Sequence, residues 1–211
     1  MRLKDVAGVA AVVLAFGGVI ALGGLMSTRA KIAEHKAAAA AHDRMTIAMS
    51  ATCVSLSGDP DRDFARLMIS HHQGAVDMAE IELQYGTDPE IRSLAWDIVT
   101  TQRPQIDQMS RWKREHPASA PAKGEAERSG YAAANSRMMR GMASGGVARS
   151  QSADLDFVRM MLPHHQGAVD MAEVELELGR DPGLRTLARN IVVGQRAEIA
   201  QMTAWLRRNG R

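Results

Sequence analysis

A long internal repeat constrains this chain more than any other feature of its sequence. Residues 63–113 align without a gap to residues 156–206, at an offset of 93 positions, and about 30 of the 51 aligned positions are identical. The strongest stretch, HHQGAVDMAE, begins at His71 and again at His164. Since a repeat of this strength means that one supersecondary unit occurs twice, the fold is predicted to consist of two equivalent halves.

Each repeat carries the signals of a helical hairpin. Asp59 precedes Pro60, which is the usual order of an N-cap and a first helical residue. Gly86 is predicted to end the first helix in a left-handed conformation, and the pair Asp88-Pro89 then starts the second helix. The predicted helices cover about 60–85 and 89–115 in the first repeat and about 154–178 and 182–208 in the second.

The turn within each repeat is short, which forces its two helices to run antiparallel. Two such hairpins that bury each other's apolar face predict an all-α fold, an antiparallel four-helix bundle over residues 59–211, with the repeats at 60–115 and 154–208. Residues 117–152 are rich in Ala, Ser and Gly and are predicted to be a mobile linker. We expect a pseudo-two-fold axis along the bundle, so that the first helices of the two repeats lie diagonally.

The chain begins with a candidate membrane segment. An uncharged run of 21 residues, residues 6–26, follows the basic residues Arg2 and Lys4. As a helix it would be about 30 Å long, which matches the hydrocarbon core of a bilayer. Because secretory signals have shorter apolar regions, residues 1–27 are predicted to be a transmembrane anchor, with a signal peptide as the alternative. The remainder is expected outside the cytoplasm, in the periplasm or at the cell surface.

Charge and cysteine content exclude several classes of protein. The 26 basic and 24 acidic residues leave a net charge of +2, which provides no basic field for nucleic acid. The single cysteine, Cys53, excludes an internal disulfide and a cysteine-based zinc or iron–sulfur site, and it is interpreted as an incidental thiol. The unusual features are 14 methionines and two adjacent histidine pairs.

The histidine pairs lie on the apolar face of the first helix of each repeat. On a helical wheel His71 is at the centre of the apolar stripe and His72 is at its edge. Counted from the hairpin turn, the antiparallel neighbour of His71 is near Gln102, with Met109 one or two turns beyond. The expected two-fold relation brings both pairs to one level, at a bundle end lined by methionine sulfur.

Buried imidazoles without partners are costly, so these pairs indicate hydrogen bonds or a metal ion. Imidazole and thioether together favour Cu(I), the imidazoles also suit Cu(II), and zinc gains little from methionine. Met68 can share an ion with His71 and His72, whereas Met78 and Met171 are expected to form a separate layer. The candidate metal ligands are His71, His72, Met68, Met78, Met109, His164, His165, Met161, Met171 and Met202.

Simpler interpretations exist for the same residues. Methionine fills irregular gaps in protein cores, so packing alone can explain a methionine stripe. Recent duplication can explain part of the identity between the repeats. Two further groups fit auxiliary copper capture and a solvated helix or loop equally well. They are His35, His42, Met45 and Met49 on one face of a predicted helical stalk, residues 28–58, and Met138, Met139 and Met142 in the linker.

Taken together, these residues resemble the family catalogued as domain of unknown function 305. Its pattern, a phenylalanine, M-x-x-H-H-x-x-A-x-x-M-A and then Q-x-x-x-I-x-x-M-x-x-W, occurs twice, from Phe64 to Trp112 and from Phe157 to Trp205. The resemblance implies a ferritin-like four-helix bundle, usually secreted or membrane-anchored in bacteria. It also implies similarity to the periplasmic copper-binding members of the CopM type, which take up copper through Met and His.

We therefore expect a non-enzymatic, extracytoplasmic protein that buffers or relays copper. Its expected partners are the copper ion, the membrane and a protein that exchanges copper with it. One alternative is a metal-free interaction module of the cell envelope. Another is a ferritin-like di-iron enzyme, which requires Glu-x-x-His on facing helices. The sequence contains no such motif, and the inward-facing Glu82 and Glu175 are expected near the hairpin turns, far from the histidines.

Overall fold

The computed structural model describes residues 56–117, 125–145 and 152–210, together with the isolated positions 29, 33, 36, 37 and 40; between 125 and 145 it describes the side chains of residues 130–141. The predicted anchor 1–27 and Cys53 lie outside these residues. The four His and Met residues of the stalk face also lie outside them. Within the described ranges, no helix is both long enough and apolar enough to cross a membrane.

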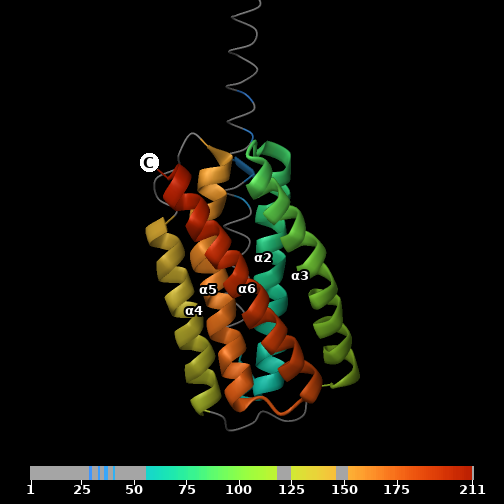
Figure 1. Ribbon diagram of the computed structural model, residues 1–211. Coiled ribbons are helices and arrows are strands. Elements are labelled where there is room, and N and C mark those ends of the chain that lie inside the picture. Colours follow the sequence, from blue (N-terminus) through green and yellow to red (C-terminus); the bar gives the residue numbers. More distant parts are fainter. Residues whose placement is uncertain are drawn as a thin grey trace, which may run out of the picture. The chain divides into compact units, whose positions relative to one another are not determined.

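The described part of the chain is helical and contains no strand. The helices α2 (Pro60–Tyr85) and α3 (Pro89–Glu115) form the first hairpin, and α5 (Ala153–Leu178) and α6 (Pro182–Asn209) form the second (Figure 1). The predicted helical boundaries are confirmed to within one residue. The additional helix α4 (Glu125–Gly145) lies between the two hairpins in sequence.

Side-chain caps explain why the helices begin where they do. The carboxylate of Asp59 accepts a hydrogen bond from the backbone N–H of Arg62, and that of Asp88 accepts from Glu90 and Ile91. Each of these caps precedes a proline, which has no N–H to satisfy in the first helical turn. The same Asp-Pro signal starts α6, so three of the helix starts follow directly from the sequence.

The glycine after the first helix of each hairpin does not adopt the left-handed conformation that the sequence predicts. Gly86 has φ −66° and ψ 150°, and Gly179 has φ −66° and ψ 149°, which is extended backbone. The requirement for glycine is one of space. A Cβ atom at Gly86 would overlap the carboxyl group of Glu82, and one at Gly179 would overlap that of Glu175.

Reciprocal contacts between the hairpins define the symmetry of the bundle. Asp61, in the first turn of α2, accepts hydrogen bonds from the backbone N–H groups of Arg180 and Asp181, in the turn of the second hairpin. Asp154, in the first turn of α5, accepts from those of Thr87 and Asp88 in the same way. The start of each first helix therefore meets the turn of the other hairpin, and α2 runs antiparallel to α5.

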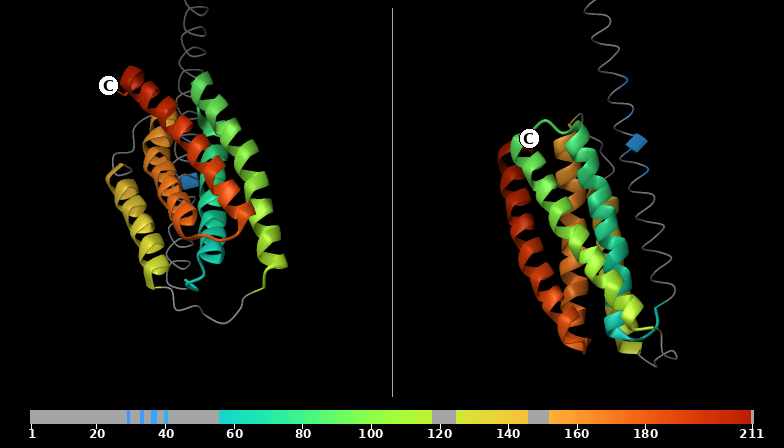
Figure 2. Two further views of the ribbon diagram at one scale, coloured as in Figure 1. Left: turned by 60° about the horizontal axis from the view of Figure 1, so that its bottom comes forward. Right: turned by 90° about the vertical axis from the view of Figure 1, so that its right-hand side faces the viewer.

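The pseudo-two-fold axis is thus perpendicular to the bundle, and the predicted axis along the bundle is wrong. The tryptophan indoles agree, because Trp112 donates to Asp181 and Trp205 donates to Asp88. Helices α2 and α5 pack directly on each other, α3 packs on α2, and α6 packs on α5 (Figure 2). The sequence could not fix the direction of the axis, because the two repeats are equivalent about an axis in either direction.

The predicted mobile linker 117–152 instead contains the helix α4, which packs on the bundle. Tyr131, Ala134 and Met138 of α4 are buried against the rest of the bundle. The Tyr131 hydroxyl donates to the backbone carbonyl of Pro60 and lies 3.3 Å from a carboxyl oxygen of Glu175. The Ala, Ser and Gly content that suggested a loop allows α4 to lie close to α5.

A substitution at Gly167 of α5 can test the close approach of α4 to α5. A Cβ atom there would lie 2.7 Å from both Cβ and Cγ of Met138, so Gly167→Ala is expected to destabilise the protein by about 1–3 kcal/mol through overpacking. Gly194→Ala on α6 is the matched control, because nothing lies within 4 Å of its Cβ position, and it should stabilise by about 0.5–1 kcal/mol. Urea unfolding measures both changes, and equal effects would contradict the packing of α4 on α5.

Candidate metal centre

The two inner histidines meet at the middle of the bundle. His71 of α2 and His164 of α5 are the twelfth residues of their helices and are fully buried. Their ring centroids are 3.7 Å apart, with 39° between the ring planes. The prediction that both histidine pairs reach one level is therefore confirmed, but this level is the centre of the bundle and the predicted bundle-end position is wrong.

The two outer histidines extend this group toward α3 and α6. His72 and His165 are also fully buried, and each ring centroid is 6.3 Å from that of its inner neighbour. His72 Nε2 lies 2.7 Å from Oε1 of Gln105 on α3, and His165 Nε2 lies 2.6 Å from Oε2 of Glu198 on α6. We call His71, His72, His164 and His165 the histidine layer.

Hydrogen bonds decide which ring nitrogen carries the proton in two of these imidazoles. His71 Nε2 donates to the backbone carbonyl of His164 at 3.0 Å, and His165 Nε2 donates to the Glu198 carboxylate. Because carbonyl and carboxylate oxygens only accept, the proton of each neutral ring is on Nε2. The lone pair on Nδ1 of both rings is then available to a metal ion.

Many buried polar atoms at this level have no hydrogen-bond partner among the described residues. They are Nδ1 of all four histidines, Nε2 of His164, both amide atoms of Gln102 and Oε1 of Gln195. Buried nitrogen and oxygen atoms in native proteins nearly always have a partner, and an orphaned one costs about 1–3 kcal/mol. Such a concentration of ligand-type atoms in one layer favours a bound group that satisfies them.

Burial holds three imidazoles of the histidine layer in the neutral form that binds metals. It lowers the pKa of His71 and of His164 well below the ordinary value, and the nearby imidazoles add to the effect in both cases. Burial also lowers the pKa of His72 to about 4, although the Gln105 hydrogen bond acts in the opposite direction. At neutral pH these three imidazoles are therefore uncharged and need lose no proton to bind a metal.

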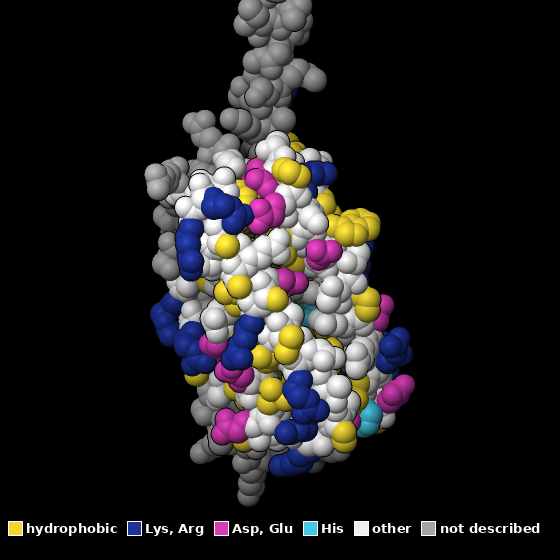
Figure 3. Space-filling view, viewed as in Figure 1, with side chains coloured by type: hydrophobic (Ala, Val, Ile, Leu, Met, Phe, Trp, Pro, Cys, Tyr) yellow, Lys and Arg dark blue, Asp and Glu magenta, His cyan; other side chains and the backbone are white. Residues whose placement is uncertain are grey.

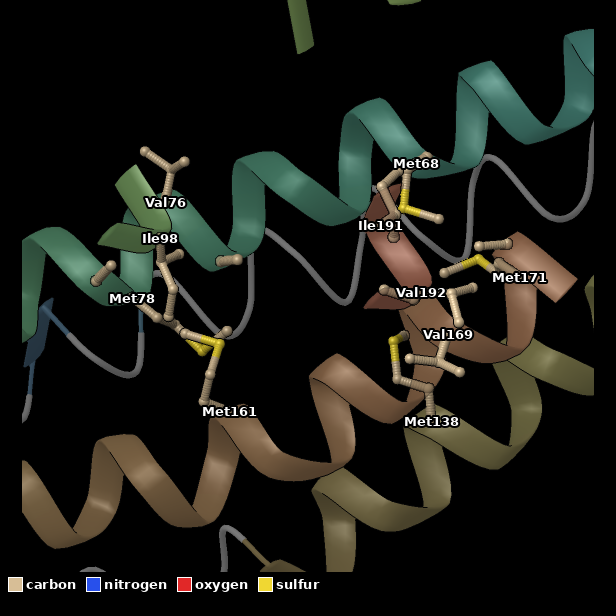
Figure 4. Close-up of a cluster of buried hydrophobic side chains, with 14 of the residues drawn as sticks. Met68, Val76, Met78, Ile98, Met138, Met161, Val169, Met171, Ile191 and Val192 are labelled. Carbon is tan, nitrogen blue, oxygen red and sulfur yellow. The ribbon is translucent and has the colours of Figure 1, made fainter. Parts of the chain in front are cut away.

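The antiparallel register divides the methionines into two groups, one on each side of the histidine layer. With His71 opposite His164, Met78 is about one helical turn from the level of Met161, and Met68 is about one turn from the level of Met171. Figure 4 shows the same pairing, with Met78 beside Met161 and with Met68 near Met171 and Ile191. All four side chains are buried.

Met109 of α3 and Met202 of α6 extend these two groups. Both side chains are fully buried, and the hairpin register places Met109 near the level of Met68 and Met202 near that of Met161. The prediction of a separate layer shared by Met78 and Met171 is wrong, because the perpendicular axis places these two residues on opposite sides of the histidines. Each histidine pair instead has its own sulfur group within one to two turns.

The histidine layer is not a ready-made site for a hard metal ion. No group of three or more His, Cys, Asp and Glu side chains in the described ranges is arranged to hold a metal. A site here must therefore include thioether sulfur or rotated rings, and sulfur is a ligand for soft ions such as Cu(I). The unpartnered Nδ1 atoms and the flanking methionines fit copper in this respect, through His71, His72, His164 and His165 with Met68 or Met161.

Glu82 and Glu175 lie away from the histidine layer, as expected. Both are buried, and Glu175 reaches Tyr131 and Asp61 where the start of α2 meets the second hairpin turn. Burial raises the pKa of Glu175 to about 9, and the charge of Asp61 adds to this. Neither glutamate joins the histidines, so these carboxyl groups give no support to a di-iron site.

Two site residues, Gln105 and Glu198, were not predicted from the sequence. Each follows the outer histidine of its repeat by 33 residues and contacts it across the hairpin. This separation could have identified both residues from the sequence, since it is the separation expected for antiparallel neighbours at this level of the hairpin.

Of the methionine cluster predicted in the linker, Met138 packs on Gly167. The side chain of Met142 lies outside the described residues.

Comparisons with known proteins cover the part of the chain that contains the histidine layer. Residues 61–206 match the model of the family described as Domain of unknown function (DUF305). The structure of CopM in the Cu(I)-bound form is 33% identical, with a TM-score of 0.54, and the match covers 70% of this chain and 96% of CopM. CopM structures in Cu(II)-bound and Ag-bound forms match at 31% and 32% identity, with the same TM-score.

Two DUF305 structures also match. A DUF305 fragment from Deinococcus radiodurans is 32% identical over 71% of this chain and 96% of its own, with a TM-score of 0.52. A putative secreted DUF305 protein from Streptomyces coelicolor is 29% identical over 74% of this chain and 95% of its own, with a TM-score of 0.58. Comparison with curated proteins gave no match. The helical fold, the doubled His-His motif and the family match together show that this chain belongs to the DUF305 family.

Proposed function

We propose that this protein binds copper in the histidine layer and buffers or relays it without catalysing a reaction. The observation that carries the proposal is that four buried imidazoles meet at one level, each with an unpartnered Nδ1 atom. A metal ion satisfies several of these atoms at once. Binding therefore removes a cost that the metal-free fold carries in its centre.

The chemistry of the surroundings favours copper. Two methionine groups flank the layer, and thioether with neutral imidazole is a soft donor set that suits Cu(I), while the imidazoles also suit Cu(II). That CopM has been solved with Cu(I), Cu(II) and Ag supports the choice of metal. The ten candidate ligands from the sequence divide accordingly, with the four histidines as the primary ligands and the nearest methionines, Met68 and Met161, completing the site.

The position of the layer suggests how copper is exchanged. All four histidines are fully buried, so the ion reaches them only when the bundle opens locally. Gln105 and the Glu198 side chain, which is 17% exposed, cover the outer histidines on the side of α3 and α6. Figure 3 views the molecule from this side. Slow entry through this cover suits a buffer, and ligand exchange along the methionines suits transfer to a partner that accepts copper.

The cellular setting is part of the same proposal. The apolar residues 6–26 anchor the chain in a membrane and leave the bundle outside the cytoplasm. A protein that exchanges copper with the bundle is then sought in the periplasm or at the cell surface. Protease accessibility of the bundle in intact and permeabilised cells tests this arrangement.

Copper titration of the full-length protein in detergent tests the proposed site. Replacement of all four layer histidines by alanine is expected to weaken copper binding by more than about a hundredfold, since these are direct ligands. The wild-type melting temperature should rise with copper, because a ligand that binds only the folded state stabilises it. His116→Ala, at an exposed histidine outside the layer, is the control. Unchanged affinity in the fourfold variant would eliminate the site.

A further inference from the structure

The two outer histidines of the histidine layer are held by different side chains. His72 is held by the amide of Gln105 and His165 by the carboxylate of Glu198, at 2.7 and 2.6 Å. Gln105 and Glu198 are separated by the repeat offset of 93 residues, so they occupy equivalent places. Equivalent positions in the two repeats thus provide one negatively charged partner and one neutral partner.

The two partners differ in which tautomer of the neighbouring imidazole they allow. A glutamine amide can present its oxygen or its NH2 group to His72, and it can therefore satisfy either tautomer. A carboxylate can only accept, so His165 keeps its proton on Nε2 and its lone pair on Nδ1. This Nδ1 atom is buried and has no partner among the described residues.

Charge is the second consequence. A carboxylate on the far side of a ligating imidazole orients the ring and makes it a stronger donor, an arrangement common around protein-bound metals. The additional negative charge stabilises a divalent ion more than a monovalent one, because the Coulomb energy scales with the charge of the ion. The neutral Gln105 has no such preference.

We propose that Glu198 is a positioning and specificity-determining residue, which makes His165 a ligand through Nδ1 and gives the second half of the histidine layer the stronger hold on Cu(II). The inference rests on the proposed function, since it concerns the same site. Its two parts, the fixed tautomer and the preference for Cu(II), are measured separately.

Glu198→Gln gives both outer histidines a glutamine partner and is the first variant to examine. In the metal-free full-length protein, nitrogen NMR of labelled histidine should show a single His165 tautomer in the wild type and a mixture in the variant. Competition titrations should show Cu(II) affinity lower by about tenfold or more and Cu(I) affinity changed by about threefold or less. Gln105→Glu is the reciprocal variant and should raise Cu(II) affinity by about tenfold. Glu173→Gln, at a half-exposed carboxylate paired with Arg196, should change neither.

The outcomes separate this inference from the function on which it rests. If wild-type protein binds copper and Glu198→Gln leaves the Cu(II) affinity within about twofold, the inference fails and the copper site stands. An unchanged His165 tautomer in the variant also overturns it. Equal losses of Cu(I) and Cu(II) affinity contradict the preference for Cu(II). If wild-type protein binds neither Cu(I) nor Cu(II), the proposed function itself fails.

Discussion

Replacing His71 and His164 together by leucine should make the metal-free bundle more stable by about 2–5 kcal/mol and should remove its copper binding. Three of the unpartnered atoms, Nδ1 of both rings and Nε2 of His164, disappear in this variant, and each costs about 1–3 kcal/mol where it is buried. Leucine also has a volume close to that of histidine, and the buried side chains of Met68 and Met161 lie one helical turn away. The prediction opposes the usual result that substitutions in a core destabilise.

Denaturant unfolding of both proteins after metal removal measures this change. His116→Leu is the matched control, because that residue is exposed and its ring contacts the exposed end of α3, where it stacks on Trp112 and its Nδ1 lies 2.8 Å from the Trp112 carbonyl; it should alter stability by at most about 1 kcal/mol. A metal-free double variant that is less stable than wild type would show that the imidazoles are satisfied within the fold. The fold would then need no bound ion to satisfy them.

Acid should unfold the metal-free protein in the range set by its buried histidines. Burial lowers the folded-state pKa values of His71, His72 and His164, so the unfolded chain binds more protons and stability falls as the pH drops below about 6.5. For His72, whose folded pKa is about 4, the loss between pH 6.5 and pH 4 is on the order of 3 kcal/mol. His71 and His164 act in the same direction.

Melting temperatures recorded between pH 7 and pH 4 check this prediction. The decrease should be clearly smaller for the variant with leucine at positions 71 and 164, since two of the responsible groups are absent. Copper-loaded wild-type protein should also resist acid until protons displace the metal from the imidazoles. Equal pH dependence in wild type and the double variant would mean that other groups control acid unfolding.

The helices and their caps could be predicted from sequence because their signals are local. Asp59-Pro60 and Asp88-Pro89 fix helix starts through bonds to the first turn, and the apolar stripe around His71 identifies the buried face. The duplication also predicted a long-range contact, because equivalent residues that lie near a two-fold axis meet each other, and His71 lies near the middle of its helix. This is why the meeting of His71 and His164 was predictable.

The remaining features depend on contacts that have no local signal. The direction of the axis follows from Asp61 and Asp154 capping the opposite hairpin turns, and it decides which methionines are neighbours. The linker was predicted to be mobile because its small residues resemble a loop, yet two of them, Gly130 and Gly141, let α4 lie close to α5. Gln105 and Glu198 were missed because a polar residue on a partly exposed helical face has no signature until its antiparallel partner is known.

The fold keeps a polar layer, with several unpartnered atoms that destabilise the metal-free protein, in its fully buried interior. Hydrophobic residues at the same places would stabilise the metal-free protein, so the layer is most simply explained by a ligand that it binds. The methionine groups on both sides are consistent with this, although methionine alone would only indicate a well-filled core.

The most direct test is X-ray diffraction at the copper edge from crystals of the copper-loaded full-length protein. We predict an anomalous peak within the histidine layer, about 2 Å from ring nitrogens of at least two of His71, His72, His164 and His165. A copper signal confined to other positions, such as the exposed His116, with the layer rings still unliganded, would contradict the account.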